Sequence, residues 1–183
     1  LALNTQDKLK DAKELCDLYP VDNCSERIRE KDAQLRFQAL IDAGKNANSF
    51  EQKRSKFLEA KAFCEKNSLA VLNWNCQSIA DDLLQKLYTD RYQEQLNSLA
   101  SLRNFDDKWK VISELEILVN DNPTYLGSKK TELSDRKYRL QEEELTRLRS
   151  KLESSSAFED KENAYLDAID FVKKYRLNEK SLL

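Results

Sequence analysis

Four cysteines are the residues of this chain best suited to specific chemistry. Cys16 and Cys24 flank one predicted connection between helices, and Cys64 and Cys76 flank the next connection of the same kind. This repetition favours Cys16–Cys24 and Cys64–Cys76 over the two other pairings that four cysteines allow. Disulfides there would close loops of 9 and 13 residues. Each would stabilise the fold by about 2.5 to 3 kcal/mol, because it restricts the conformations of the unfolded chain.

Two other interpretations of the cysteines are open. Reduced thiols at Cys16 and Cys64 would pack well as small apolar side chains. Both stand at apolar positions of an internal repeat, described below, where other copies have valine. Cys24 and Cys76 have no such packing reason to recur among polar residues at helix starts, so disulfides are favoured. A zinc site is less favoured still, because the chain has no CxxC pair and no histidine.

The remaining polar residues do not combine into a recognisable reaction centre. The absence of histidine removes the commonest general base and the usual partner of a serine or cysteine nucleophile. Neighbouring carboxylates such as Asp81 and Asp82 lie in strongly polar stretches, where hydrated surface is the usual interpretation. We therefore predict no enzyme activity, no catalytic residue, no metal and no cofactor.

The elements that carry these residues are predicted by an internal repeat. The segments FEQK at Phe50, FDDK at Phe105 and FEDK at Phe158 each open the same apolar pattern. Apolar residues follow each phenylalanine after 7, 10, 13 and 14 positions. This spacing places them on one face of a helix, which is called the stripe below. A fourth copy opens the chain with Leu9, Ala12, Leu15 and Cys16. The pattern predicts four short helices that recur at nearly constant intervals along the chain.

Longer helical patterns lie between the short ones. They cover residues 25–46, 76–103 and 128–154. The first two carry an aromatic residue, Phe37 or Tyr92, 13 positions before the phenylalanine that opens the next short helix. The third carries Leu145 there. Because a 25-residue helix is close to 38 Å long and a 16-residue helix about 24 Å, we expect each long helix to overhang its short partners.

Helix starts are also encoded locally. Ser49 with Gln52, and Ser156 with Glu159, have the spacing of a capping box, and Asn104 precedes two acidic residues. Ser25 is interpreted as a further cap. With 2 glycines and 2 prolines in 183 residues and no strand pattern, we predict an all-α fold of tandem antiparallel hairpins, with seven helices alternating short and long, in one domain spanning residues 1–183.

The charge distribution excludes some classes of partner. The chain carries 31 basic and 33 acidic residues in an interspersed order, so no basic patch suited to nucleic acid or an anionic membrane is expected. No apolar run approaches the roughly 20 residues of a membrane span. The cysteines favour an oxidising compartment, and a chain without methionine that begins at Leu1 is expected to be part of a longer exported protein, periplasmic, secreted or at the cell surface.

Connections from a short helix to the next long helix differ from the polar connections in the other direction. They carry apolar and aromatic residues: Leu18, Tyr19, Leu69, Val71, Leu72, Trp74, Tyr125 and Leu126. In an up-and-down stack these loops would lie on one edge, where aromatic side chains on a rigid scaffold could contact a partner. Alternatively, the loops could fold back as core over the overhanging long helices.

The function predicted from these features is a non-catalytic interaction or scaffold module that binds another protein through the loop edge. The helical sensor domain of a membrane receptor, with a cavity for a small apolar ligand, is one alternative. A rigid spectrin-like spacer is the other. The first hypothesis predicts that Trp74→Ala changes stability by less than about 1 kcal/mol.

Overall fold

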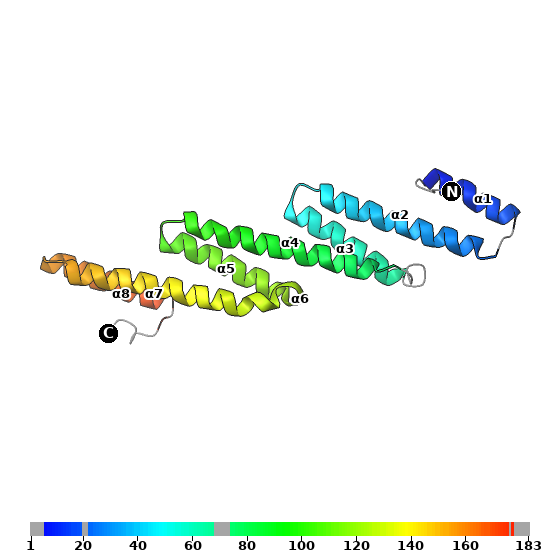
Figure 1. The fold of residues 1–183 in the computed structure, drawn as a ribbon. Coiled ribbons are helices and arrows are strands. Elements are labelled where there is room, and N and C mark those ends of the chain that lie inside the picture. The colour runs from blue at the N-terminus through cyan, green and yellow to red at the C-terminus, as the bar shows by residue number, and fades with distance from the viewer. Residues whose placement is uncertain (1–5, 20–21, 68–73, 176, 178–183) are drawn as a thin grey trace. The chain divides into compact units, whose positions relative to one another are not determined.

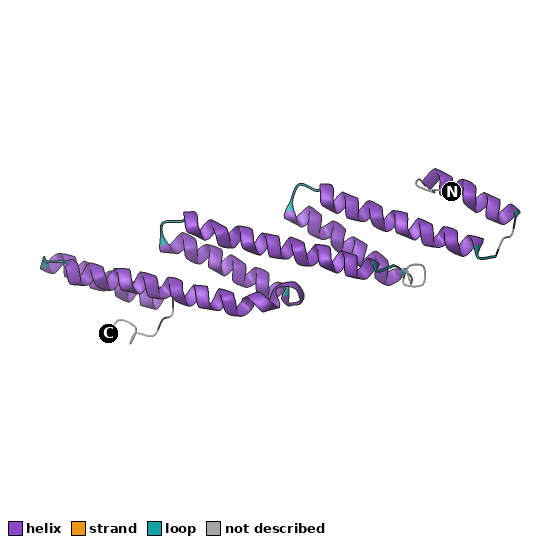
Figure 2. Ribbon diagram, viewed as in Figure 1, coloured by secondary structure: helices purple, strands orange, loops and turns teal. Residues whose placement is uncertain are grey.

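The computed structural model describes residues 6–19, 22–67, 74–175 and 177. The chain divides into two compact units, Leu1–Arg91 and Tyr92–Leu183. The described residues form helices and contain no strand (Figures 1 and 2), which confirms the predicted all-α fold. The expectation that residues 1–183 fold as one cooperative domain stays a prediction.

The helices alternate between short and long as the repeat predicts. The first unit holds α1 (Gln6–Leu18), α2 (Cys24–Asn46), α3 (Phe50–Lys66) and most of α4 (Cys76–Ser98). The second holds the end of α4, α5 (Phe105–Asp121), the four-residue α6 (Pro123–Leu126), α7 (Lys130–Ser154) and α8 (Phe158–Lys174). Short 3-10 segments, Leu99–Ser101 and Gly127–Lys129, stand where the sequence predicts the end of one long helix and the start of another.

The short helices α3, α5 and α8 each begin at the predicted phenylalanine and are each 17 residues long. Ser49 Oγ accepts a hydrogen bond from the Gln52 amide at 3.2 Å, and Asn104 Oδ1 accepts one from the Asp107 amide at 2.7 Å. These bonds satisfy amides that would otherwise lack a partner at a helix start. Local capping thus fixes where α3 and α5 begin.

Two of the predicted caps are wrong. The residue before α8 is Ala157, which makes no side-chain cap, so Ser156 lies one position too early to serve. Ser25 lies inside α2, because Cys24 already occupies its first position and Asn23 precedes it with a left-handed backbone (φ 64°). Asparagine tolerates this conformation better than most residues.

Most repeat positions are buried as predicted. The aligned trio that precedes the opening phenylalanines, Phe37, Tyr92 and Leu145, is almost fully buried. The core positions of the short helices are Phe57, Ala60 and Cys64 in α3, Ile112, Leu115 and Val119 in α5, and Ala164, Ala168, Phe171 and Val172 in α8. Their spacing, mostly in steps of three or four positions, gives each helix one apolar face.

Two of the long helices, α2 and α7, are each shared between two short ones. The first half of α7 meets α5, where Lys137 Nζ lies 2.8 Å from Glu116 Oε1. Its second half meets α8, where Leu145 and Leu148 form a buried cluster with residues of α8. In the first unit, α2 likewise packs against both α1 and α3. In α2 and α7 the predicted overhang therefore has a structural use, because one long helix covers two short helices.

Two stripe positions depart from the prediction because they are exposed. One is Tyr165, which is more than half exposed. Phe57, the equivalent residue of α3, packs against Gly44, which has no side chain. The second departure, Leu15, lies on α1.

Candidate interaction surface

The structure brings both predicted cysteine pairs to disulfide distance. The Cα atoms are 5.8 Å apart in the Cys16–Cys24 pair and 6.0 Å apart in the Cys64–Cys76 pair, and both values lie within the range of protein disulfides. Among the described residues no cysteine is left free. The first pair ties the end of α1 to the start of α2, and the second ties the end of α3 to the start of α4.

An apolar patch lies next to the first pair. Leu15 and Leu18 of α1, and Tyr19 directly after it, are 56%, 71% and 68% exposed. The Tyr19 amide donates a hydrogen bond to the Leu15 carbonyl, so the three side chains lie on one side of this helix end. Sequence reasoning assigned Leu15 to the core stripe, which is wrong. The equivalents of Leu15 in the other short helices, Phe63, Leu118 and Phe171, are half-buried or buried. Leu15 differs because, among the described residues, no long helix precedes α1 to cover it.

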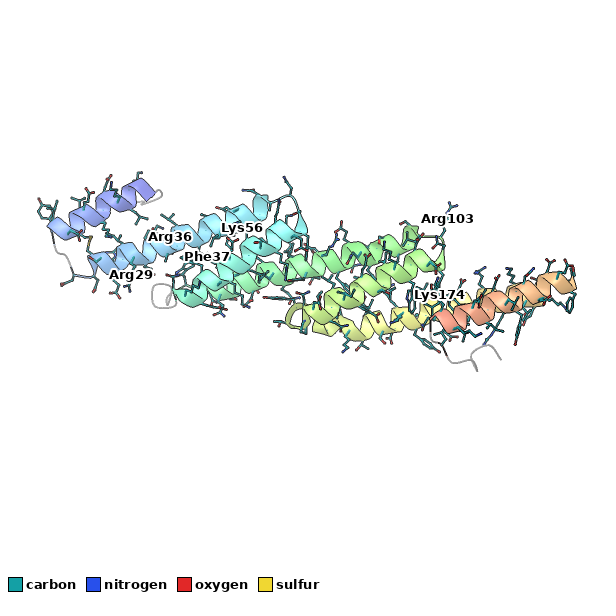
Figure 3. All side chains as sticks on the ribbon, turned by 180° about the vertical axis from the view of Figure 1, so that it is seen from behind. Arg29, Arg36, Phe37, Lys56, Arg103 and Lys174 are labelled. Carbon is teal, nitrogen blue, oxygen red and sulfur yellow. A yellow bond between two sulfur atoms is a disulfide. The ribbon has the colours of Figure 1, made fainter. Side chains whose placement is uncertain are left out.

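The opposite side of α1 faces α2 across a charged cleft of about 860 Å³. Its lining includes Lys10, Lys13, Arg29 and Arg36 together with Glu26 and Asp32. Figure 3 labels Arg29 and Arg36 on α2, and Arg36 Nε lies 2.9 Å from Asp32 Oδ2. Sequence reasoning did not detect this cleft, because its charges come from two helices and are interspersed with apolar residues.

Trp74 belongs to the packing of the first unit rather than to a free surface. It is half-buried, and its ring meets that of Phe37 edge-on with the centroids 4.8 Å apart. Phe37 stands near the middle of α2, so the contact lies about 20 Å along the helix from Cys24. The prediction that Trp74 could be truncated without loss of stability therefore does not fit the structure, because the indole covers a core ring.

The other loop residues that were predicted to contact a partner differ in their exposure. Leu18 and Tyr19 are exposed, whereas Leu69, Val71 and Leu72 lie outside the described residues. Leu126 is fully buried, so its assignment to a partner surface is wrong. Tyr125 is half-buried. The reason is that Pro123 begins the extra helix α6, which folds the apolar residues of this connection inward.

Sequence reasoning missed an aromatic cluster in the second unit. Phe105 and Trp109 of α5 meet Phe171 and Tyr175 at the end of α8, with ring centroids 4.8 to 5.5 Å apart. The Tyr175 hydroxyl donates a hydrogen bond to Asp106, and Lys174 Nζ lies 3.0 Å from the same carboxylate. No local signal reveals this cluster, because its two halves lie in helices that are far apart in the chain.

The cluster gives a prediction for the pH dependence of stability. The hydrogen bond from Tyr175, followed by Lys174, lowers the pKa of Asp106 below 3.8. The interaction therefore stabilises the fold at pH values above about 4 and is lost as the pH falls through the lowered pKa. In denaturant titrations from pH 7 to pH 2, Asp106→Asn should lose less stability than the wild type. The difference should be at most about 1 kcal/mol, because the group is exposed.

Tyr175→Phe is the matched control for this prediction. It removes the hydroxyl that contributes most to the lowered pKa of Asp106 and retains the ring that packs on Phe105. This variant should reproduce most of the effect that Asp106→Asn has on the pH dependence of the free energy of unfolding. Equal slopes for the wild type and Asp106→Asn would show that the carboxylate does not hold these contacts in solution.

Charged side chains are prominent in the clefts among the described residues. Three clefts in that part of the chain, of about 860, 750 and 600 Å³, are each lined by several charged side chains. No group of three or more potential metal ligands occurs within the described ranges. Across those ranges, no helix has both the length and the hydrophobicity needed to cross a membrane.

Comparisons with protein-family models, with curated proteins and with solved structures gave no match.

Proposed function

We propose that this chain is a non-catalytic module of an exported protein and that it binds another protein through an apolar patch on α1. The patch consists of Leu15, Leu18 and Tyr19, and its exposure is the observation that carries the proposal. Exposed leucines grouped with an aromatic residue are costly to leave in water and are typical of contact surfaces. This surface replaces the longer loop edge predicted from the sequence.

The neighbouring cysteine pair supports the proposal in two ways. Cys16 lies within the patch segment and is tied to Cys24, so the patch is held on a braced helix end and loses little freedom when a partner binds. Two cysteine pairs at disulfide distance are also typical of proteins outside the cytoplasm. Periplasmic, secreted or cell-surface location is therefore the compartment we propose.

Of the two alternatives, the ligand-binding sensor gains no support from the described clefts. Charged side chains line them, whereas a site for a small apolar molecule is lined mainly by apolar and aromatic groups. We therefore keep protein binding as the proposed function.

The test is a capture experiment with a photo-crosslinking amino acid in place of Tyr19. Wild-type protein and a Leu15→Ser/Leu18→Ser variant, each carrying the crosslinker, are irradiated with the extracytoplasmic fraction of the native host. The wild type should form one defined adduct, and the variant should lose it by about 30-fold, since hot-spot residues contribute about 2 kcal/mol or more.

The matched control is Ile117→Ser, which changes an exposed apolar residue on α5. It should leave the adduct unchanged, and all variants should retain the circular dichroism and melting temperature of the wild type. Equal yields from the patch variant and the wild type would contradict binding at α1. An adduct with a small molecule rather than with a protein would favour the sensor alternative.

A further inference from the structure

The junction between α1 and α2 contains an acceptor motif for N-linked glycosylation. Asn23, Cys24 and Ser25 match the pattern Asn-x-Ser/Thr, in which the asparagine can carry an oligosaccharide. The sequence contains one other match, Asn122-Pro123-Thr124, and its middle proline excludes it as an acceptor. The chain therefore offers a single candidate site, which lies at the start of α2.

Asn23 lies where a bulky sugar chain can be carried. The residue is exposed, and its side chain makes no capping hydrogen bond to α2. Its backbone carbonyl accepts a hydrogen bond from the Arg27 amide at 3.0 Å, so the main chain rather than the side chain joins Asn23 to the first turn of α2. The side-chain amide is thus not needed to begin the helix.

Ser25 is also placed suitably for recognition. The sequence favoured a cap at Ser25, which would have engaged its hydroxyl in the fold. In the structure Cys24 is the first residue of α2 and Ser25 the second, and the residue before the helix is Asn23. Ser25 is exposed. Because Ser25 does not cap the helix, its hydroxyl is not required for the start of α2, and the glycosylation motif explains why a hydroxyl stands there.

The Cys16–Cys24 pair is compatible with the modification. Cys24, the middle residue of the motif, is half-buried and lies at disulfide distance from Cys16, whereas Asn23 and Ser25 on either side of it are exposed. A sugar that is added to the open chain can therefore stay in place when the disulfide closes. Disulfides and N-linked sugars are both typical of secreted proteins.

We propose that Asn23 is a site of N-linked glycosylation, modified by an oligosaccharide transferase of the secretory pathway. The Asn23 side-chain nitrogen forms a bond to carbon 1 of a sugar that is carried on a lipid diphosphate. The bond between this carbon and the diphosphate oxygen breaks, the lipid diphosphate leaves with the electron pair, and the amide nitrogen loses one proton. The proposal relies on the exported location proposed above and is independent of the α1 patch.

The test is secretion of the whole chain from a eukaryotic cell behind a cleavable leader. Mass spectrometry of the intact protein should show one oligosaccharide on the chain, and peptide-N-glycosidase should remove it. This enzyme leaves an aspartate where the sugar was attached. Peptide mapping should therefore find aspartate at position 23 and asparagine at position 122.

Two substitutions of Ser25 form a matched pair, because both leave Asn23 unchanged. Ser25→Thr retains the hydroxyl and should retain the sugar, whereas Ser25→Ala should lose it. Both variants should keep the circular dichroism of the wild type, since Ser25 is exposed and does not cap α2. A wild-type chain without sugar, or equal modification of the Ser25→Ala variant, would overturn the proposal.

A thiol count on the same secreted sample separates this proposal from the exported location. Paired cysteines on a chain without sugar would contradict the site at Asn23 and leave the proposed compartment in place. Four free thiols on a chain that carries the sugar would support the site and contradict the disulfides.

Discussion

Replacing Cys64 and Cys76 together by alanine should lower the free energy of unfolding by about 3 kcal/mol. Their sequence separation is 12, and a disulfide that closes a loop of this size restricts the unfolded chain by roughly that amount. Both cysteines are also almost fully buried, so the substitution removes packed sulfur atoms as well. Denaturant unfolding under non-reducing conditions, followed by far-ultraviolet circular dichroism, measures the loss.

The Cys16→Ala/Cys24→Ala variant is the matched comparison. Its pair joins α1 to α2, and among the described side chains of α1 only Leu9 and Cys16 are buried. The expected result is loss of the helical signal of α1 while the main transition stays in place. If the natively purified protein titrates with four free thiols, the disulfides and the proposed compartment are both wrong.

A methyl group at Gly44 should destabilise the first unit by about 1 to 2 kcal/mol, although alanine is the better helix former. A Cβ there would lie 2.7 Å from Phe57 Cδ1, and the ring is almost fully buried. Overpacking costs about 1 to 3 kcal/mol, whereas the gain in helix propensity is at most about 1 kcal/mol. Thermal unfolding of Gly44→Ala measures the difference.

Gly127 provides the control for this prediction. It has an ordinary helical backbone, with φ −55°, and a Cβ there meets nothing within 4 Å. Gly127→Ala should therefore stabilise the protein by about 0.4 to 1 kcal/mol. Adding Phe57→Leu to Gly44→Ala should restore part of the lost stability, because a smaller side chain frees the space. Equal melting temperatures for Gly44→Ala and the wild type would show that the ring contact is looser than the structure indicates.

Features that depend on neighbouring residues were predictable from the order of the amino acids alone. The phenylalanines that open α3, α5 and α8, the caps at Ser49 and Asn104 and the spacing of the apolar stripes all act within one or two helical turns. The cysteine pairs were also predictable, because each spans a single connection between consecutive helices. Such short-range chemistry needs no knowledge of distant segments.

The division of apolar residues between core and surface emerged only when the helices were packed together. Leu15 and Tyr165 occupy stripe positions that are buried in other copies of the repeat, yet both are exposed. Leu126 lies in a connection whose sequence predicted an exposed loop, yet it is buried. Their burial depends on what lies opposite: no described helix stands before α1 to cover Leu15, and the extra helix α6 folds Leu126 inward. The aromatic cluster around Asp106 likewise joins residues far apart in the chain. Burial is set by packing between distant segments, which a local pattern does not encode.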